Sequence, residues 1–187
     1  MPNNPSKRDR RTIRLKNRDY SAAGMYFVTV CTHGRACILG KVVDSKMELN
    51  AYGKIVEVEW IRSSKIRSEI RSNIYQVMPN HFHAIVEIAE KPIGLNGVTD
   101  VVGAHGRAPL RRKPKSLSSL MAGFKSSVAS KINGLRHTPG MPVWQRNYYE
   151  HIIRNENELR QIGEYVIHNV LKWELDAENP KNWRKQR

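Results

Sequence analysis

The sequence predicts a single α+β domain in which helices pack on one face of a mainly antiparallel sheet. Strand-like and helix-like segments alternate along the chain as strand, helix, strand, helix, strand, helix, and no internal repeat is present. A length of 187 residues suits one domain with some chain to spare. We therefore place the domain at residues 20–176, after a basic arm (1–19) and before a polar tail (177–187).

Segments rich in β-branched and aromatic residues mark the strands. They lie within residues 25–32, 37–43, 74–88 and 143–153, and the second of them is expected to be short. A Pro-Asn pair at 79–80 divides the third segment into two strands. The long stretch at 91–115 is expected to be a basic loop, because it combines Gly, Pro and late basic residues without a periodic pattern.

Three helices are predicted from a capping residue followed by apolar positions at helical spacing. They span Asn50 to Lys65, Ser116 to Gly134 and Asn155 to about Trp173. The apolar positions expected to face the core are Ile55, Val58, Trp60 and Ile61 in the first helix, Leu117, Leu120, Met121, Phe124, Val128 and Ile132 in the second, and Leu159, Ile162, Val166, Val170 and Trp173 in the third.

Charge gives the first functional expectation. The formal net charge is +15 and the isoelectric point is near 10.1, an excess that attracts polyanions. No basic helix with a bulky apolar face is evident, so nucleic acid is favoured over an anionic membrane surface. A merely soluble basic protein is the plainer alternative.

Basic residues gather in the arm, in the loop and in the second helix. They are expected to contact DNA phosphates, which would make binding sensitive to salt. The candidate DNA-binding residues are Arg8, Arg10, Arg11, Arg14, Lys16, Arg111, Arg112, Lys113 and Lys125.

Features of exported and membrane proteins are missing from the sequence. There is no apolar run near the roughly 18 residues of a membrane span, and no apolar segment follows the basic N-terminus. Cys31 and Cys37 form neither a CxxC pair nor a zinc-finger spacing, so we interpret them as reduced thiols. The expected location is cytoplasmic, in association with the nucleoid.

His81 and His83 are the first candidates for chemistry. Residues at i and i+2 on a strand project from the same face, so the two imidazoles could converge on one cation. Phe82 and Ala84 would point the opposite way, into the core. Two imidazoles are too few for most metal sites, so an oxygen ligand should come from elsewhere. Two exposed histidines with no metal are the plainer alternative.

Tyr165 and Asn169 lie four residues apart in the last predicted helix, along the edge of its apolar stripe. Facing the histidines, Asn169 could supply an oxygen to the metal and Tyr165 could attack a phosphate. The alternative from spacing alone is an interface tyrosine beside a polar residue at the helix end.

Several strings spread through most of the chain carry a resemblance to a known family. They are Arg14-Leu15-Lys16, Asp19-Tyr20, Tyr26-Phe27-Val28-Thr29, Met78-Pro79-Asn80-His81-Phe82-His83, Ser119-Leu120, Phe124-Lys125-Ser126, Val143-Trp144-Gln145, Tyr149-Glu150-His151, Ile153-Arg154-Asn155, Glu164-Tyr165 and Asn169. With these strings the chain resembles the REP-associated tyrosine transposases, members of the HUH single-tyrosine superfamily, whose name describes a His, hydrophobe, His segment.

The resemblance implies a ferredoxin-like core with the histidines on a central strand. It further implies His81, His83 and Asn169 as ligands of Mg²⁺ or Mn²⁺, and Tyr165 as the nucleophile. The family's usual Asn-Pro pair is here Asn169-Val170, so the last helix is expected to continue where proline would end it.

The strand-like block at 143–153 contains further candidates. Tyr148 or Tyr149 would be the rival nucleophile if the last helix were assigned wrongly. His151 is interpreted as structural or as a DNA contact, and Trp144 and Gln145 as residues that hold the strand in place.

The expected reaction is cleavage and transfer of single-stranded DNA beside a foldback hairpin. Attack by Tyr165 would give a 5′-phosphotyrosine and a free 3′-OH without ATP, and no phosphate-cradling glycine loop is present. The rivals are a binding module for single-stranded nucleic acid that has no catalysis, and a metal-dependent nuclease that uses water. Monomer and homodimer both remain open.

Overall fold

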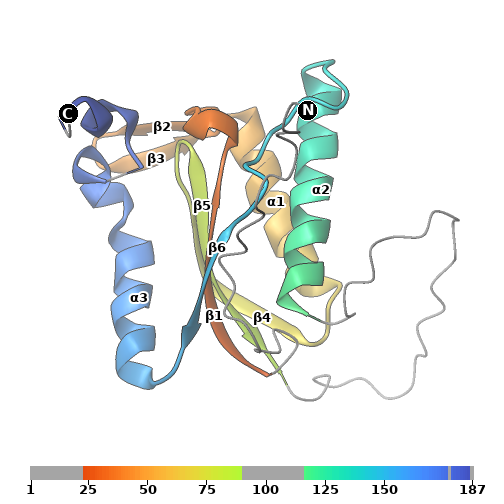
Figure 1. Ribbon diagram of the computed structural model, residues 1–187, viewed down its shortest axis with the longest axis vertical. Coiled ribbons are helices and arrows are strands. Elements are labelled where there is room, and N and C mark those ends of the chain that lie inside the picture. Colours follow the sequence, from red (N-terminus) through yellow and green to blue (C-terminus); the bar gives the residue numbers. More distant parts are fainter. Residues whose placement is uncertain (1–22, 90–115, 177, 186–187) are drawn as a thin grey trace, which may run out of the picture.

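The computed structural model describes residues 23–89, 116–176 and 178–185. At its centre is a four-stranded antiparallel sheet (Figure 1). Its strand order is β4-β5-β1-β6. The strands are β1 (Gly24–Cys31), β4 (Ile70–Val77), β5 (His81–Ile88) and β6 (Tyr149–Ile153). The α+β class and the antiparallel sheet are as predicted. The basic arm and the loop at 91–115 lie outside the described residues.

A separate hairpin joins β2 (Gly40–Val43) to β3 (Lys46–Leu49). Asp44 and Ser45 both have positive φ, 47° and 58°, as in the two-residue turns that match strand twist. The sequence predicted only the first strand of this pair. The second was missed because an Asp-Ser turn lacks the glycine that usually marks such a connection.

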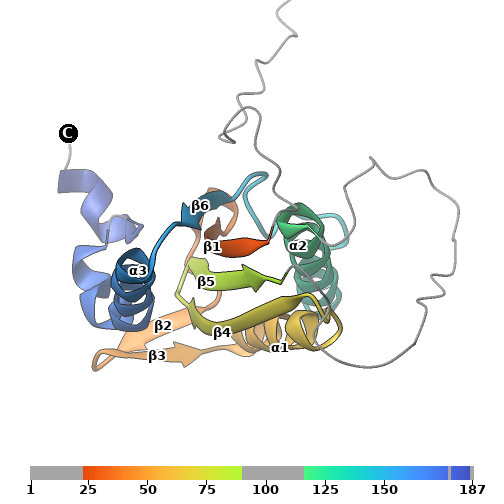
Figure 2. The same cartoon turned by 90° about the horizontal axis from the view of Figure 1, so that it is seen from below.

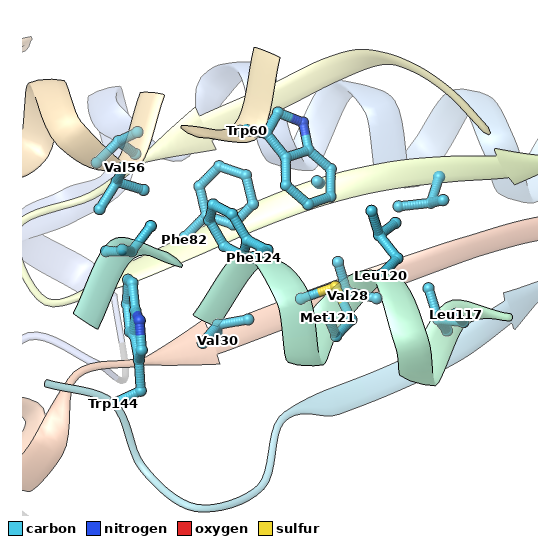
Figure 3. Close-up of a cluster of buried hydrophobic side chains, with 14 of the residues drawn as sticks. Val28, Val30, Val56, Trp60, Phe82, Leu117, Leu120, Met121, Phe124 and Trp144 are labelled. Carbon is cyan, nitrogen blue, oxygen red and sulfur yellow. The ribbon is translucent and has the colours of Figure 1, made fainter. Parts of the chain in front are cut away.

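Helices α1 (Ala51–Lys65) and α2 (Leu117–Leu135) cover one face of the sheet, as Figure 2 shows. The six apolar positions predicted for the second helix are all buried. Around Phe82 of β5, the rings of Trp60 and Phe124 pack with centroid distances of 4.8 Å and 5.2 Å (Figure 3). This cluster is the main core and gives β5 a fixed orientation.

The buried face of α1 differs from the prediction. Asn50 caps the helix as expected, and Trp60 is buried, but Val58 and Ile61 are 56% and 37% exposed. The inward face instead carries Val56 and the buried carboxylate of Glu59. Glu59 faces α2, where Ser127 and Lys131 bind its oxygens. The helix is therefore oriented so that the Glu59 carboxylate, bound by side chains of α2, faces that helix. Val58 and Ile61 face away from the core.

Helix α3 (Glu156–His168) lies on the opposite face of the sheet (Figure 2). There Val166 packs against Phe27, Ile85 and Ile153, which form a second apolar cluster. The prediction that helices cover one face is thus right for α1 and α2 and wrong for α3. The physical reason is that β1 and β5 carry apolar side chains on both faces, so both faces need a cover.

The chain beyond α3 continues in two 3₁₀ helices, η2 (Val170–Leu175) and η3 (Pro180–Lys185). Beyond the predicted domain end at residue 176 the chain still packs on the fold, because Asn179 is buried and its amide donates to the carbonyl of Trp173 at 2.9 Å. Across the described ranges, no helix is both long and apolar enough to cross a membrane.

Candidate active site

The alternation along β5 places His81 and His83 on the α3 face of the sheet, opposite to Phe82 and Ala84, as predicted. Both imidazoles are almost completely buried, and their ring centroids lie 4.5 Å apart. Buried polar side chains need partners, so the contacts of the four ring nitrogens decide what these histidines can do.

Asn80 orients His81. Its Nδ2 donates to the carbonyls of Arg35 and Glu178, at 3.0 Å and 2.7 Å, which leaves Oδ1 as the acceptor that faces His81 Nδ1 at 2.8 Å. Nδ1 of His81 must therefore carry the proton, and Nε2 of the neutral ring presents a lone pair. Metal-binding histidines are commonly held in this way by an acceptor behind the ring.

Thr29 and Phe27 of β1 orient His83. Thr29 is the register partner of His83, and its hydroxyl lies 2.8 Å from His83 Nδ1. The Phe27 ring stacks on the imidazole, with centroids 5.4 Å apart and planes inclined by 28°. The hydroxyl and the ring together fix the direction of Nε2 toward the site.

Burial keeps both histidines neutral. It lowers the pKa of His81 to about 3, with a smaller contribution from the charge of Arg35. It also lowers the pKa of His83 well below its ordinary value, and the neighbouring His81 acts in the same direction. At neutral pH the two rings are bases with free lone pairs, the form in which histidine binds metals.

Helix α3 brings Tyr165 to the histidines, as the sequence suggested. The Tyr165 ring lies 5.4 Å from that of His83 and meets Phe27 edge-on at 6.1 Å. The residue is 44% exposed, so a DNA strand can reach its phenol. Burial raises the pKa of Tyr165, and the charges of Asp176 and Glu178 raise it further. A hydrogen bond from the Asn169 side chain acts in the opposite direction.

Asn169 is buried at the end of α3, where it is the C-cap residue. The α-helix ends at His168, and the chain continues from Val170 as the 3₁₀ helix η2. The expectation that valine would let the helix continue is therefore wrong. The bond to Tyr165 lowers the pKa of the phenol, so the Asn169 amide N–H is the donor and Oδ1 stays available.

The atoms that remain could hold a metal ion. Within the described residues, four buried side-chain atoms of this region lack a hydrogen-bond partner: His81 Nε2, His83 Nε2, Asn169 Oδ1 and Asp176 Oδ2. Among those same residues no group of three His, Cys, Asp or Glu side chains could hold a metal ion alone, so a cation at this place would also need the amide oxygen of Asn169, with or without a carboxylate. Nitrogen and oxygen donors of this kind suit a divalent cation.

Three residues of this region were not predicted to have a role in the site. Asn80 stands in the string that carried the resemblance, but its role depends on contacts with residues 35 and 178. Thr29 would follow from the strand register, which the sequence does not give. Asp176 lies in the segment after α3 and offered no signal.

Two residues of the strand-like block at 143–153, His151 and Trp144, make structural contacts. His151 Nε2 lies 2.6 Å from a carboxylate oxygen of Glu158, which ties β6 to the first turn of α3. Trp144 is nearly buried and pairs with Thr32, as its structural interpretation required.

The Lys125 side chain forms hydrogen bonds within the protein. Its ammonium donates to the carbonyls of Gln145, Arg146 and Asn147 at 2.7–3.3 Å, which holds the loop before β6. The other candidate DNA-binding residues lie outside the described residues.

The two rival tyrosines are placed differently. Tyr148 packs against the main core. Tyr149 pairs with Thr29 and therefore shares the face of the histidines, and its ring lies 6.2 Å from that of Phe27. Cys31 and Cys37 are free, and burial raises the pKa of the Cys31 thiol to about 12, so this thiol is not a nucleophile at neutral pH.

No model of a known protein family matches the sequence. Among solved structures, a REP-associated tyrosine transposase bound to a REP hairpin superimposes with a TM-score of 0.56 at 20% identity, covering 86% of this chain and 74% of that one. The chain therefore has the fold of a tyrosine transposase of this class. An uncharacterized protein of Haemophilus influenzae is 35% identical over 167 residues, 89% of this chain and 91% of that protein. The chain belongs to the same family as that protein.

Proposed function

We propose that the protein is a tyrosine transposase that cuts single-stranded DNA and transfers the cut strand. The observation that carries this proposal is the position of Tyr165, which is half-exposed and whose ring centroid lies 5.4 Å from that of buried His83. Within the described residues, Nε2 of His83 and Nε2 of the adjacent His81 ring have no hydrogen-bond partner. A nucleophile beside a set of ligand atoms is the arrangement that phosphoryl transfer requires.

His81, His83 and Asn169 would hold the cation, Mg²⁺ or Mn²⁺. When bound, it would supply Lewis-acid stabilisation of the negative charge that develops on the scissile phosphate. The fold would hold these ligands in position before a cation binds, because Asn80 and Thr29 fix the two rings. Burial lowers the pKa of both imidazoles and keeps them unprotonated. A preset arrangement avoids reorganisation during the reaction.

Tyr165 would perform the exchange itself. Its phenol oxygen forms a bond to phosphorus while the bond to the 3′ oxygen breaks, which gives a 5′-phosphotyrosine and a free 3′-OH. Asn169 supports the step because its amide N–H bonds to the phenol oxygen and stabilises the phenolate. The phosphodiester energy is kept in the covalent link, so a 3′-OH can reverse the reaction without ATP.

The proposed substrate is a single strand beside a DNA hairpin. The net charge of +15 supports a polyanionic partner, and the solved transposase of the same fold is bound to a REP hairpin. The arm residues Arg8, Arg10, Arg11, Arg14 and Lys16, and the loop residues Arg111, Arg112 and Lys113, are proposed to grip the phosphates. Work on DNA would place the protein in the cytoplasm, with the nucleoid.

The test is a search for a covalent adduct. The protein is mixed with hairpin oligonucleotides that carry 5′ single-stranded extensions of varied sequence, with Mg²⁺ or Mn²⁺, and run on a denaturing gel. We expect a protein–DNA band that survives boiling in detergent and disappears with EDTA or with Tyr165→Phe. Tyr149→Phe is the matched control, because it removes the same hydroxyl from the same face, and it should keep the band.

The other outcomes separate the rivals. Cleavage without an adduct would indicate a nuclease that uses water. Salt-sensitive hairpin binding with neither cleavage nor adduct would indicate a binding module. An adduct lost in Tyr149→Phe and kept in Tyr165→Phe would assign the nucleophile to β6.

A further inference from the structure

Asp176 introduces a carboxylate into the site from the segment that follows η2. Its side chain is only 8% exposed, and one of its oxygens, Oδ1, accepts from the backbone N–H of Glu178 at 2.7 Å. The other oxygen, Oδ2, is buried and has no hydrogen-bond partner within the described chain. That oxygen faces Nε2 of His81 at 3.9 Å.

At 3.9 Å the two atoms are too far apart for a hydrogen bond, and within the described residues neither has another hydrogen-bond partner. Asn80 Oδ1 binds Nδ1 of His81, which leaves Nε2 as the ring atom that faces the carboxylate oxygen. Two electron-rich atoms held together away from water are unfavourable unless a positive charge lies with them. The arrangement is the one expected of two ligands of a common cation.

The charge of the site leads to the same conclusion. The other three unpartnered atoms belong to two neutral imidazoles and an amide, so that set carries no negative charge to balance a dication. Asp176 supplies one. Carboxylate oxygens are also the ligands that Mg²⁺ and Mn²⁺ prefer.

The fold holds this carboxylate in place through the same residue that orients His81. Asn80 Nδ2 donates to the carbonyl of Glu178, next to the loop that positions Asp176. Asn182 Nδ2 donates to the carbonyl of Asp176 itself at 2.9 Å. Arg35 pairs with the Glu178 carboxylate, with 3.1 Å between Nε and Oε2. Asn80 thus couples the imidazole to the C-terminal segment.

We propose that Asp176 is a further, charged ligand of the cation site, contributed by the segment after η2. This inference rests on the proposed function, since it concerns the same site. It differs from a structural role for Asp176, which would need only the Oδ1 contact with Glu178 and would leave metal affinity unchanged.

Calorimetric titration of the full-length, metal-free protein with Mn²⁺ tests the inference. Asp176→Asn keeps an acceptor oxygen for Glu178 and removes only the charge. We expect its Mn²⁺ affinity to fall 10-fold to 100-fold, within the range known for groups that support metal ligands. Glu174→Gln, which makes the same charge change at an exposed neighbour paired with Lys181, should stay within about twofold of wild type, given how weak exposed pairs are. Asp176→Glu should recover part of the loss.

Thermal unfolding without metal provides the second measurement. An unpartnered carboxylate beside a lone pair is unfavourable, so metal-free Asp176→Asn should unfold at the same or a higher temperature than wild type. Wild-type Mn²⁺ affinity in Asp176→Asn, with loss of binding in His81→Gln, would overturn the role of Asp176 and leave the proposed function intact. Absence of Mn²⁺ binding in the wild-type protein would instead remove the metal site from both proposals.

Discussion

On the face of the sheet that α1 and α2 cover, β5 places Phe82 and Ala84 among apolar side chains. On the opposite face the same strand places His81 and His83, which are just as deeply buried but whose Nε2 atoms have no hydrogen-bond partner in the described parts of the chain. One strand therefore serves two purposes, separated by its alternation of side chains. The first face contributes to stability. The second face buries polar atoms without hydrogen bonds, which costs free energy that a bound ligand would offset.

The largest expected difference between the faces concerns stability. Phe82→Ala empties the centre of the ring cluster formed with Trp60 and Phe124. Large-to-small changes of this kind cost about 3–5 kcal/mol, which is a large part of the stability of an ordinary domain. Urea unfolding of the variant measures the loss. His83→Gln, one position away on the other face, should cost much less, and equal losses would contradict the division between the faces.

Acid should lower the free energy of unfolding of the metal-free protein, because His81 is buried as a neutral ring. The pKa of His81 is about 3 in the folded protein against an ordinary value of 6.5, so between these values the unfolded chain binds a proton that the native state does not. The stabilisation is complete above 6.5 and is lost as the pH falls toward 3. His81 should therefore remove about 1.4 kcal/mol per pH unit in this window.

Unfolding in urea at a series of pH values measures this slope. His81→Gln should make it shallower, whereas His168→Gln, which removes an exposed histidine from α3, should leave it unchanged. A slope that is the same in all three proteins would mean that carboxylates, and not the buried histidine, govern acid unfolding.

Metal should stabilise the protein through the same face. At a Mn²⁺ concentration 100 times the dissociation constant, binding to the native state alone adds about 2.7 kcal/mol. That is equivalent to a rise of roughly 5–10 °C in the unfolding temperature for a domain of this size. Differential scanning calorimetry with Mn²⁺ and then EDTA measures the gain and its reversal.

His83→Gln should abolish the gain. His151→Gln is the matched control, because His151 lies on the same face of the sheet and its ring is held by Glu158. It should respond to Mn²⁺ as the wild-type protein does. A gain that survives in His83→Gln would place the bound ion elsewhere.

The sequence predicted those parts of the molecule that depend on local patterns. The two faces of β5, the buried stripe of α2 and the pairing of Tyr165 with Asn169 all follow from periods of 2 and 3.6 residues. Contacts between distant segments did not follow. The orientation of α1 depends on Lys131 meeting Glu59, and the site includes Asp176, which lies 95 positions after His81. Such partners are chosen by the tertiary fold.

The smallest expected effect concerns Lys125, a basic residue whose side chain stabilises the fold. Lys125 was predicted to bind DNA, but its ammonium bonds to three carbonyls of the loop before β6. Lys125→Met should therefore lower stability by about 1–2 kcal/mol, because charged hydrogen bonds are lost. Hairpin affinity should change less than twofold, since no phosphate contact is removed.

Fluorescence anisotropy with a labelled hairpin at several salt concentrations distinguishes the two roles of Lys125. A residue that neutralises one phosphate lowers the slope of log affinity against log salt by about one when it is removed. We expect that change for Arg112→Gln, whose side chain is proposed to grip DNA, and an unchanged slope for Lys125→Met. A reduced slope for Lys125→Met would show that DNA displaces the loop carbonyls from the ammonium, so that the loop before β6 rearranges when the hairpin binds.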